Sequence, residues 1–232
     1  MDKYFKIDRI ATVIGDPSRL RMLIKLMDGR AYTATELSLE ADIAPSTASA
    51  HLSKLLEIGA LALEAQGRHR YYRLQDTLIA TTIETIMALT SDGKRDARGQ
   101  GPTQHDPIKT ARLCYDHLAG TLGVGITQSL EQSNFIFKNG KQFLITDAGR
   151  DFFGRFQINV DQLNTGRRQF AACCLDWSER QHHIAGAVGA AIAKHSLEVG
   201  WVKRVADSRV LIITPQGSRA LQENFDIKLP SA

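Results

Sequence analysis

The stretch from Pro45 to Ile58 concentrates short hydroxyl-bearing side chains and a few basic ones. Its apolar spacing predicts a helix whose outer face carries groups that can hydrogen-bond to base edges or phosphates. Solvated helix faces usually carry Lys, Glu and Gln instead, so a serine-rich face favours a binding role. The side chains predicted to face nucleic acid are Ser46, Thr47, Ser49, His51 and Lys54, of which all but the lysine are expected nearest the bases.

A basic segment follows this helix. Leu61–Glu64 and His69–Leu74 are predicted to be two strands around a turn with glycine at its bend. Guanidinium groups on such a hairpin can reach phosphate oxygens or a minor groove, whereas Tyr71 or Tyr72 is expected to pack at the strand base. The hairpin residues predicted to contact DNA are Gln66, Arg68, His69 and Arg70. Helix and hairpin together have the layout of a recognition helix and wing, which predicts binding to double-stranded DNA.

Breaks in the apolar pattern indicate the helices that position the serine-rich helix and the basic hairpin. A first helix ends before Pro17, which begins a second helix capped by Asp16. A third helix begins at Thr33 or Thr35, and a tight turn at Ile43–Pro45 leads into the serine-rich helix. We therefore expect a helix-turn-helix in front of the wing.

A further helix is predicted over 77–90, and it has more apolar side chains than one small domain can cover. They are Leu78, Ile79, Ile83, Ile86, Met87 and Leu89. This surplus argues for a partner helix from a second copy, so we expect a homodimer.

The rest of the chain is divided by a polar stretch, Ser91–Pro107, which is punctuated by Gly and Pro and is typical of a linker. We expect a DNA-binding and dimerisation domain over 1–90, a linker over 91–107, and an effector-binding domain over 108–232. Motifs recur in the last part: His117–Gly123 matches His183–Gly189, and Phe143–Gly149 matches Leu211–Gly217.

Each copy is predicted to run helix, β-hairpin, helix, and its glycines are expected to let two helices cross closely. The expected fold class is α+β, mainly α, with a winged helix-turn-helix domain and two helix–β-hairpin–helix repeats.

The repeated part also contains all three cysteines. Cys114, Asp116 and His117 are predicted to lie on one helix turn, where a cysteine and a histidine three apart could ligate one metal. Repeat symmetry could bring His117 and His183 together, with Cys174 nearby. The favoured interpretation is still structural, a buried thiol and hydrogen-bonded histidines, because no second Cys-x-x-Cys or His-x-x-x-His pattern occurs; no metal or other cofactor is predicted.

Other side chains of this part leave alternatives open. Adjacent Cys173 and Cys174 could sense oxidants, although a disulfide between neighbours closes a strained ring. Trp177 and Trp201 could line an organic-ligand pocket or belong to the core. The candidate effector-binding residues are Cys114, Asp116, His117, Cys173, Cys174, Asp176, Trp177 and His183.

Composition sets wider limits. The 232 residues are 43% hydrophobic and 23% charged, which is ordinary for a globular protein, and the net charge of +4 suits a polyanionic partner. Three cysteines do not make a disulfide framework, and neither a membrane-spanning run nor a leader peptide is recognisable, so a cytoplasmic protein is expected. No nucleophile elbow, phosphate loop or zinc-hydrolase spacing is present, which argues against an enzyme.

Residues 10–76 closely resemble the winged-helix domain of the ArsR family of bacterial repressors. The motifs that carry the resemblance are Gly15-Asp-Pro-Ser-Arg-Leu-Arg-Met-Leu, Thr35-Glu-Leu, Ser46-Thr-Ala-Ser-Ala-His-Leu-Ser-Lys-Leu, Gly59-Ala-Leu and Gly67-Arg-His-Arg-Tyr-Tyr-Arg-Leu. The remainder looks like the longer members of the family, which carry an added C-terminal domain. The resemblance implies a repressor of a stress or toxic-compound response that an effector releases from DNA.

The family's metal sites can be checked position by position. Ser38 and Glu40 stand where one site has cysteines, and Lys54 and Ile58 stand where the cadmium- and lead-sensing branch has them. Leu78 and Leu89 replace the histidines of a third site. Any switch is therefore expected in 108–232, as a small-molecule, metal or thiol effector; the alternative is a constitutive DNA-binding regulator.

Overall fold

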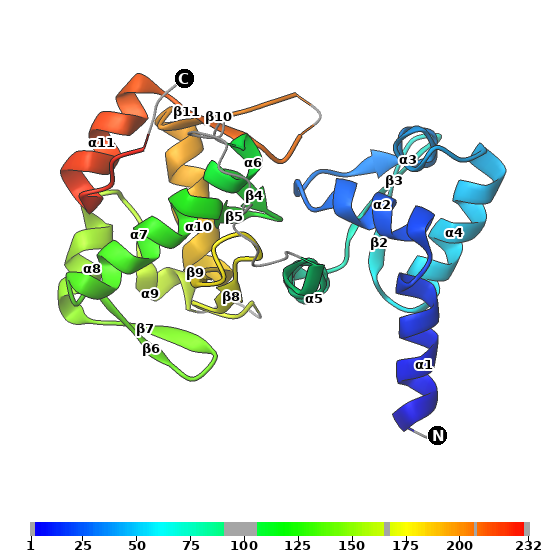
Figure 1. Cartoon of the computed structure of the whole chain (residues 1–232), viewed down its shortest axis with the longest axis horizontal. Coiled ribbons are helices and arrows are strands. Elements are labelled where there is room, and N and C mark those ends of the chain that lie inside the picture. The colour runs from blue at the N-terminus through cyan, green and yellow to red at the C-terminus, as the bar shows by residue number, and fades with distance from the viewer. Residues whose placement is uncertain (1–2, 91–105, 165–167, 207, 230–232) are drawn as a thin grey trace, which may run out of the picture. The chain divides into compact units, whose positions relative to one another are not determined.

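The computed structural model describes residues 3–90, 106–164, 168–206 and 208–229. They form a mixed α+β protein in which about half of the chain is helical. The chain divides into two compact units, Met1–Ile83 and Glu84–Ala232, called unit 1 and unit 2 below (Figure 1). The linker predicted over 91–107 lies, except for its last two residues, outside the described residues.

Unit 1 is a helix-turn-helix followed by a β-hairpin. Its elements are α1 (Lys3–Ile14), α2 (Pro17–Leu26), β1 (Tyr32–Thr33), α3 (Ala34–Ala41), α4 (Pro45–Glu57), β2 (Leu61–Gln66), β3 (His69–Leu74) and the first part of α5 (Thr77–Thr90). The three strands form an antiparallel sheet in the order β1-β3-β2. Strand β1 was not anticipated from the sequence, because two residues show no period-2 pattern.

Local signals fix the ends of these helices. The Asp16 side chain accepts a 3.0 Å hydrogen bond from the Arg19 amide, and Pro17 occupies the first turn of α2, as predicted. Of the two candidate starts for α3, Thr33 is the cap: it exchanges hydrogen bonds with Glu36 in a capping box. Gly59 follows α4 at φ +74°, a backbone conformation that favours glycine.

Unit 2 repeats one succession of elements. Hairpin, helix, hairpin and helix occur as β4 (Arg112–Cys114), β5 (His117–Ala119), α7 (Gly120–Gln132), β6 (Ile136–Asn139), β7 (Gln142–Ile145) and α8 (Asp147–Gly154). They recur as β8 (Cys173–Leu175), β9 (His182–Ile184), α10 (Gly186–Glu198), β10 (Val202–Arg204), β11 (Leu211–Ile213) and α11 (Pro215–Phe225). Short helices α6 (Pro107–Thr110) and α9 (Val160–Leu163) precede and connect the two halves.

The hairpins β4–β5 and β8–β9 correct the sequence prediction. Cys114 and His117 do not lie on a helix turn: Cys114 ends β4, His117 begins β5, and Asp116 is in the turn between them. Strands of three residues are too short to show alternation, and the neighbouring helical pattern of α7 obscures them.

The glycines of α7 and α10 permit an approach of helix to hairpin rather than of helix to helix. A Cβ at Gly123 would lie 2.3 Å from the Leu118 carbonyl oxygen and 3.6 Å from the His183 Cβ. A Cβ at Gly189 would lie 2.4 Å from the Ile184 carbonyl oxygen and 3.2 Å from the His117 Cβ. Each helix thus packs on its own hairpin and faces the histidine of the other half.

The core of unit 2 is formed by apolar side chains of both halves, and Trp201 belongs to it. Phe152, Phe156 and Phe225 pack around one another, and Phe156 and Phe225 also contact the Trp201 ring. Among the described residues, no helix combines the length and apolar character needed to cross a membrane.

Candidate DNA interface and candidate metal centre

The outer face of α4 carries the side chains predicted to meet DNA. Ala48, Leu52 and Leu55 are fully buried and anchor the helix, while Ser46, Thr47, Ser49 and Lys54 are exposed. The Ser49 hydroxyl donates to the Pro45 carbonyl at 3.0 Å, so its oxygen lone pairs remain free to accept. Short exposed side chains let a helix backbone approach base edges closely.

His51 occupies a different environment from its neighbours on α4. Its ring is half-buried, and Nδ1 lies 2.9 Å from Nη1 of Arg19, a buried side chain that also donates to the carbonyls of Thr12 and Val13. Nε2 lies 3.9 Å from Oδ1 of Asp16. The base contact predicted for His51 remains a prediction, and these contacts show that the ring joins α4 to the turn before α2.

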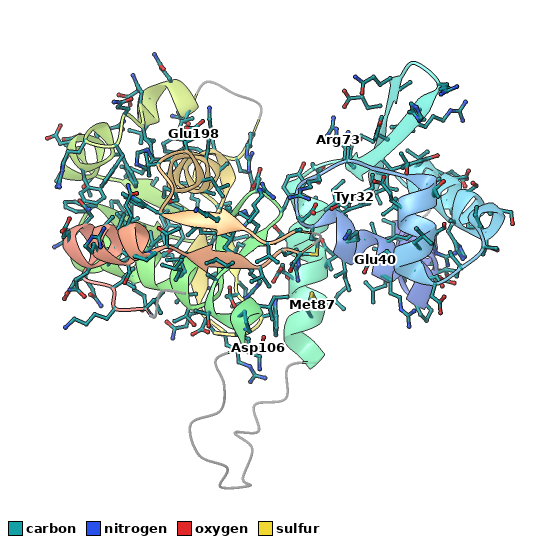
Figure 2. The ribbon with its side chains drawn as sticks, turned by 90° about the horizontal axis from the view of Figure 1, so that it is seen from above. Tyr32, Glu40, Arg73, Met87, Asp106 and Glu198 are labelled. Carbon is teal, nitrogen blue, oxygen red and sulfur yellow. The ribbon has the colours of Figure 1, made fainter. Side chains whose placement is uncertain are left out.

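The β2–β3 hairpin exposes its basic end. Gln66 pairs with His69 across Gly67-Arg68, and Gln66, Arg68, His69 and Arg70 are all exposed. Tyr72, by contrast, is buried, as expected for a residue at the strand base. Figure 2 shows the side chains along this hairpin, with Arg73 labelled near its base.

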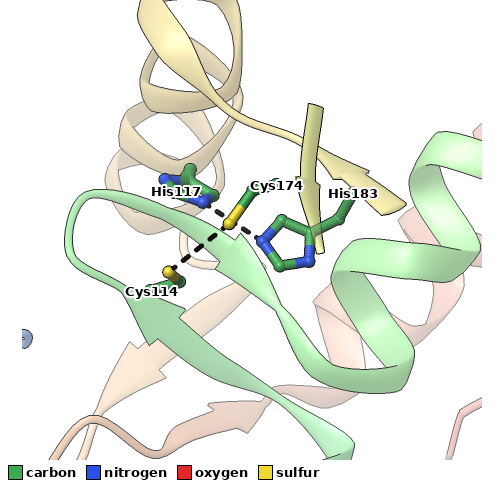
Figure 3. Close-up of side chains that lie close together, drawn as sticks. All are labelled: Cys114, His117, Cys174 and His183. Atoms are coloured by element: carbon green, nitrogen blue, oxygen red, sulfur yellow. Dashed lines mark hydrogen bonds between the residues drawn. The ribbon is translucent and has the colours of Figure 1, made fainter. Parts of the chain in front are cut away.

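In unit 2 the fold gathers four potential metal ligands. The ligand atoms of Cys114, His117, Cys174 and His183 all lie within 4.8 Å of one another, and every one of these side chains is buried. The two sulfur atoms are 3.9 Å apart and the two Nε2 atoms 3.1 Å apart (Figure 3). These four residues are called the Cys/His cluster below.

Strand register explains how the cluster forms. Cys114 is the partner of His117 across β4–β5, and Cys174 is the partner of His183 across β8–β9. Cross-strand partners project from the same face of a hairpin, so each hairpin presents one thiol and one imidazole together. Cys173 directly precedes Cys174 in β8 and therefore lies on the opposite face of the strand, outside the cluster.

A carboxylate stands behind each histidine. Asp116 Oδ1 lies 3.3 Å from Nδ1 of His117, and Asp176 Oδ2 lies 3.1 Å from Nδ1 of His183. Each aspartate is held in turn by an arginine. Arg168 contacts both carboxylate oxygens of Asp116 at 2.6 and 2.8 Å, and Arg112 contacts Asp176 at 2.9 Å.

These contacts shift proton affinities in the cluster. Burial alone would raise the pKa of Asp176, but its contact with His183 and the charge of Arg112 hold that pKa well below its usual range. For His183 burial acts in the lowering direction, yet Asp176 and Cys114 outweigh it and raise the pKa to about 9. A hydrogen bond with Cys174, together with burial, raises the pKa of the Cys114 thiol.

A buried ion network extends from the cluster to α5. Arg112 Nη2 also lies 3.5 Å from Oε2 of Glu84, and Arg209 Nη1 lies 2.8 Å from the other oxygen of that carboxylate. Glu84 and Arg112 have no solvent exposure. Glu84 lies in the part of α5 that belongs to unit 2, so this network connects the cluster with that part of the helix.

The remaining candidates of the sequence prediction lie apart from the cluster. The Trp177 ring packs on the Arg112 guanidinium at 4.7 Å. An open pocket of about 580 Å³ between α9 and α10 includes Phe156, Arg168 and His195 in its lining but neither tryptophan.

Sequence reasoning missed Glu84, Arg112 and Arg168 altogether. Asp116 and Asp176 were among the candidates, and a repeated pattern marks both of them. Cys-x-Asp occurs at 114–116 and again at 174–176, and His-x-Ala-Gly follows at 117 and 183.

A helix-turn-helix with an exposed hydroxyl-bearing helix, followed by a basic hairpin, defines a winged-helix DNA-binding protein. Residues 16–60 match the family described as "Bacterial regulatory protein, arsR family". Over 223 residues the chain is 43% identical to the HTH-type transcriptional regulator YdfF of Bacillus subtilis, which covers 96% of this chain and 98% of YdfF. The protein belongs to the arsR family of transcriptional regulators, which are not enzymes, and its C-terminal part is shared with a full-length relative.

Two further similarities each cover less than half of this chain. The HTH-type transcriptional regulator CmtR of Mycobacterium bovis is 30% identical over 88 residues, which are 36% of this chain and 74% of CmtR. The structure of HlyU from Vibrio cholerae is 25% identical and matches with a TM-score of 0.35, covering 39% of this chain and 98% of HlyU.

Proposed function

We propose that the protein is a homodimeric repressor that binds a specific operator through α4 and the β2–β3 hairpin, and that an effector bound in unit 2 releases it. The observation that carries this function is the exposed face of Ser46, Thr47 and Ser49 beside a hairpin with two exposed arginines. Hydroxyl groups of α4 would read base edges in the major groove, and Arg68 and Arg70 would bind phosphates or the minor groove. Acting on an operator requires the cytoplasmic location that the sequence predicts.

Helix α5 supports the homodimer. Leu78 is 67% exposed and Ile86 36% exposed, and they lie eight residues apart, about two turns along one side of the helix. Exposed leucine and isoleucine at this spacing are suited to a helix from a second copy. Two copies would present two recognition helices to a palindromic operator.

Unit 2 is proposed as the effector domain, built from two copies of one unit. Hairpin β4–β5 with α7 corresponds to β8–β9 with α10, and each half supplies one cysteine and one histidine to the same buried place, with an aspartate beside the histidine. The ion network ending at Glu84 on α5 supports a route by which the effector influences DNA binding.

Operator binding by variants tests the DNA interface. Sites would be selected from a randomised duplex library with the wild-type protein, and affinities measured by fluorescence anisotropy. We expect Ser49→Glu to weaken specific binding at least about 100-fold, because a carboxylate on this face repels phosphates and cannot replace the hydroxyl.

Lys194→Gln is the matched control, since it also changes the net charge by −1 but lies on α10 with a 75% exposed side chain. It should bind within about twofold of wild type, as expected for a distant surface charge. Normal affinity of Ser49→Glu, or equal losses in both variants, would refute the proposed interface.

A further inference from the structure

We propose that Cys114, His117, Cys174 and His183 bind one Zn²⁺ ion in a closed tetrahedral site that joins the two halves of unit 2. Two thiolates and two imidazoles are a set that favours zinc among the common metal ions. Each half contributes one cysteine and one histidine from a single hairpin, so the ion would cross-link segments that are sixty residues apart.

The spacing of the ligand atoms fits a tetrahedron. With zinc–nitrogen bonds of about 2.05 Å and zinc–sulfur bonds of about 2.3 Å, tetrahedral edges are about 3.3 Å between nitrogens and about 3.8 Å between sulfurs. The corresponding distances are 3.1 Å between the Nε2 atoms of His117 and His183 and 3.9 Å between the sulfurs of Cys114 and Cys174. These two edges match a zinc tetrahedron to within about 0.2 Å, and all four ligand atoms lie within 4.8 Å of one another (Figure 3).

The carboxylates determine which imidazole nitrogens face this centre. Asp116 beside Nδ1 of His117, and Asp176 beside Nδ1 of His183, favour the proton on that nitrogen. With both imidazoles neutral, as zinc ligands must be, each Nε2 directs a lone pair toward the other, only 3.1 Å away. Two lone pairs at this distance repel unless a proton or a cation lies between them. A carboxylate, histidine and metal in this order is a common arrangement at zinc sites.

Charge balance also favours a divalent ion. Thiolates at Cys114 and Cys174 would neutralise the two positive charges of Zn²⁺ within the buried cluster. The carboxylates behind the histidines are already paired with Arg168 and Arg112, so they add no uncompensated charge. Burying the complete site thus leaves no unpaired charge, which is the condition for a stable buried ion.

Oxidation of Cys114 and Cys174 to a disulfide is the competing chemistry for this cluster. It would remove two electrons and two protons and would use only the sulfurs. The two buried histidines and the aspartates behind them would have no part in that reaction. A metal accounts for all of them, and we therefore assign the cluster to zinc.

Metal binding by the full-length protein tests the site directly. Protein reduced and stripped with a chelator would be titrated with Zn²⁺ and with Co²⁺ under anaerobic conditions. We expect one ion per chain, a Co²⁺ spectrum with the visible bands of tetrahedral coordination and a sulfur-to-metal charge-transfer band, and two sulfur and two nitrogen neighbours by X-ray absorption of the zinc form. Reduced wild-type protein that takes up no zinc would overturn the proposal.

Neighbouring cysteines provide a matched pair of variants. Cys174→Ser should abolish the charge-transfer band or weaken zinc binding more than about 100-fold, whereas Cys173→Ser should bind like wild type because residue 173 faces away from the cluster. Asp176→Asn should weaken binding about 10- to 100-fold while preserving the spectrum. If Cys174→Ser fails to fold, the wild-type stoichiometry and coordination decide alone. Equal binding by the two serine variants would refute the assignment of ligands.

A role of zinc in controlling operator binding rests on the proposed function. The metal site and this regulatory role can be tested separately. We infer that zinc occupancy alters operator affinity through Asp176, Arg112 and Glu84. Operator binding of zinc-loaded and stripped wild-type protein should differ at least about fivefold, the lower range of allosteric coupling. Equal affinities would overturn this regulatory role and leave the metal site standing. A Ser49→Glu variant that binds zinc normally but not DNA would support both.

Discussion

The proposed DNA-binding surface of unit 1 and the Cys/His cluster of unit 2 are built in opposite ways. The first is one continuous stretch of chain, residues 45–74, whose functional side chains are almost all exposed. The second comes from two hairpins sixty residues apart, and all four of its side chains are buried. Surface chemistry here follows from local sequence, whereas the buried chemistry exists only after two distant segments have packed together.

This difference determines what each site tolerates. On α4 the exposed residues can change without loss of the helix, because Ala48, Leu52 and Leu55 hold it from the other side. In the cluster, by contrast, His183, Asp176 behind it and Arg112 behind that are all fully buried. Changes in unit 2 should therefore affect folding and binding together, while in unit 1 the two can be separated.

The largest effect is expected for Glu84→Ala. This change leaves the buried guanidiniums of Arg112 and Arg209 short of one negative charge, and breaking a buried ion pair costs about 3–5 kcal/mol of unfolding free energy. Both tryptophans, Trp177 and Trp201, lie in unit 2, so urea unfolding followed by tryptophan fluorescence reports on this unit.

Glu198→Ala is the control, because Glu198 is an exposed side chain whose ion pair with exposed Lys194 spans 3.8 Å. Its unfolding free energy should stay within about 0.5 kcal/mol of wild type. Equal changes in unfolding free energy for Glu84→Ala and Glu198→Ala would show that the buried network does not stabilise unit 2. The buried site would then be no more sensitive to substitution than the exposed surface.

A second change tests whether unit 1 behaves independently. Leu52→Ala removes a fully buried side chain from α4 and should destabilise unit 1 by about 2–5 kcal/mol. Hydrogen exchange of α3 and α4 peptides should accelerate and operator binding should weaken, while the tryptophan transition and zinc uptake remain unchanged. Leu39→Ala, at a 77% exposed position on α3, should leave all four measurements near wild type. A tryptophan transition displaced by Leu52→Ala would contradict separate cores.

The same contrast between local and distant contacts explains how much of each unit could be predicted from the sequence. The start of α2, the choice between two caps for α3, and the β2–β3 hairpin depend on neighbours within a few residues. The first was predicted correctly, and the hairpin was predicted with its first strand two residues too short. Hairpins β4–β5 and β8–β9 were missed because three-residue strands show no alternation.

The cluster was only partly predictable for the same physical reason. The repeated motif indicated that His117 and His183 could meet, and the fold places them together. The preference for a structural role over a metal rested on the lack of a second contiguous ligand motif, yet the partners are cross-strand neighbours rather than residues at helical spacing. Arg112 and Glu84 could not be found from the sequence, since nothing local marks a charge that will be buried by a distant segment.

The smallest expected effects come from one substitution made in each unit. Thr33 caps α3 and Thr214 caps α11, and each loses its cap hydrogen bond on change to alanine, which costs about 1 kcal/mol. Thr214→Ala should displace the tryptophan transition by this amount, while Thr33→Ala should leave it in place and accelerate hydrogen exchange in α3. Serine at either position retains the capping oxygen and should restore wild-type behaviour. If Thr33→Ala displaced the tryptophan transition as much as Thr214→Ala, the units would unfold as one. The two sites could then no longer be treated as independent, because a cap in unit 1 would stabilise unit 2 as effectively as a cap within unit 2.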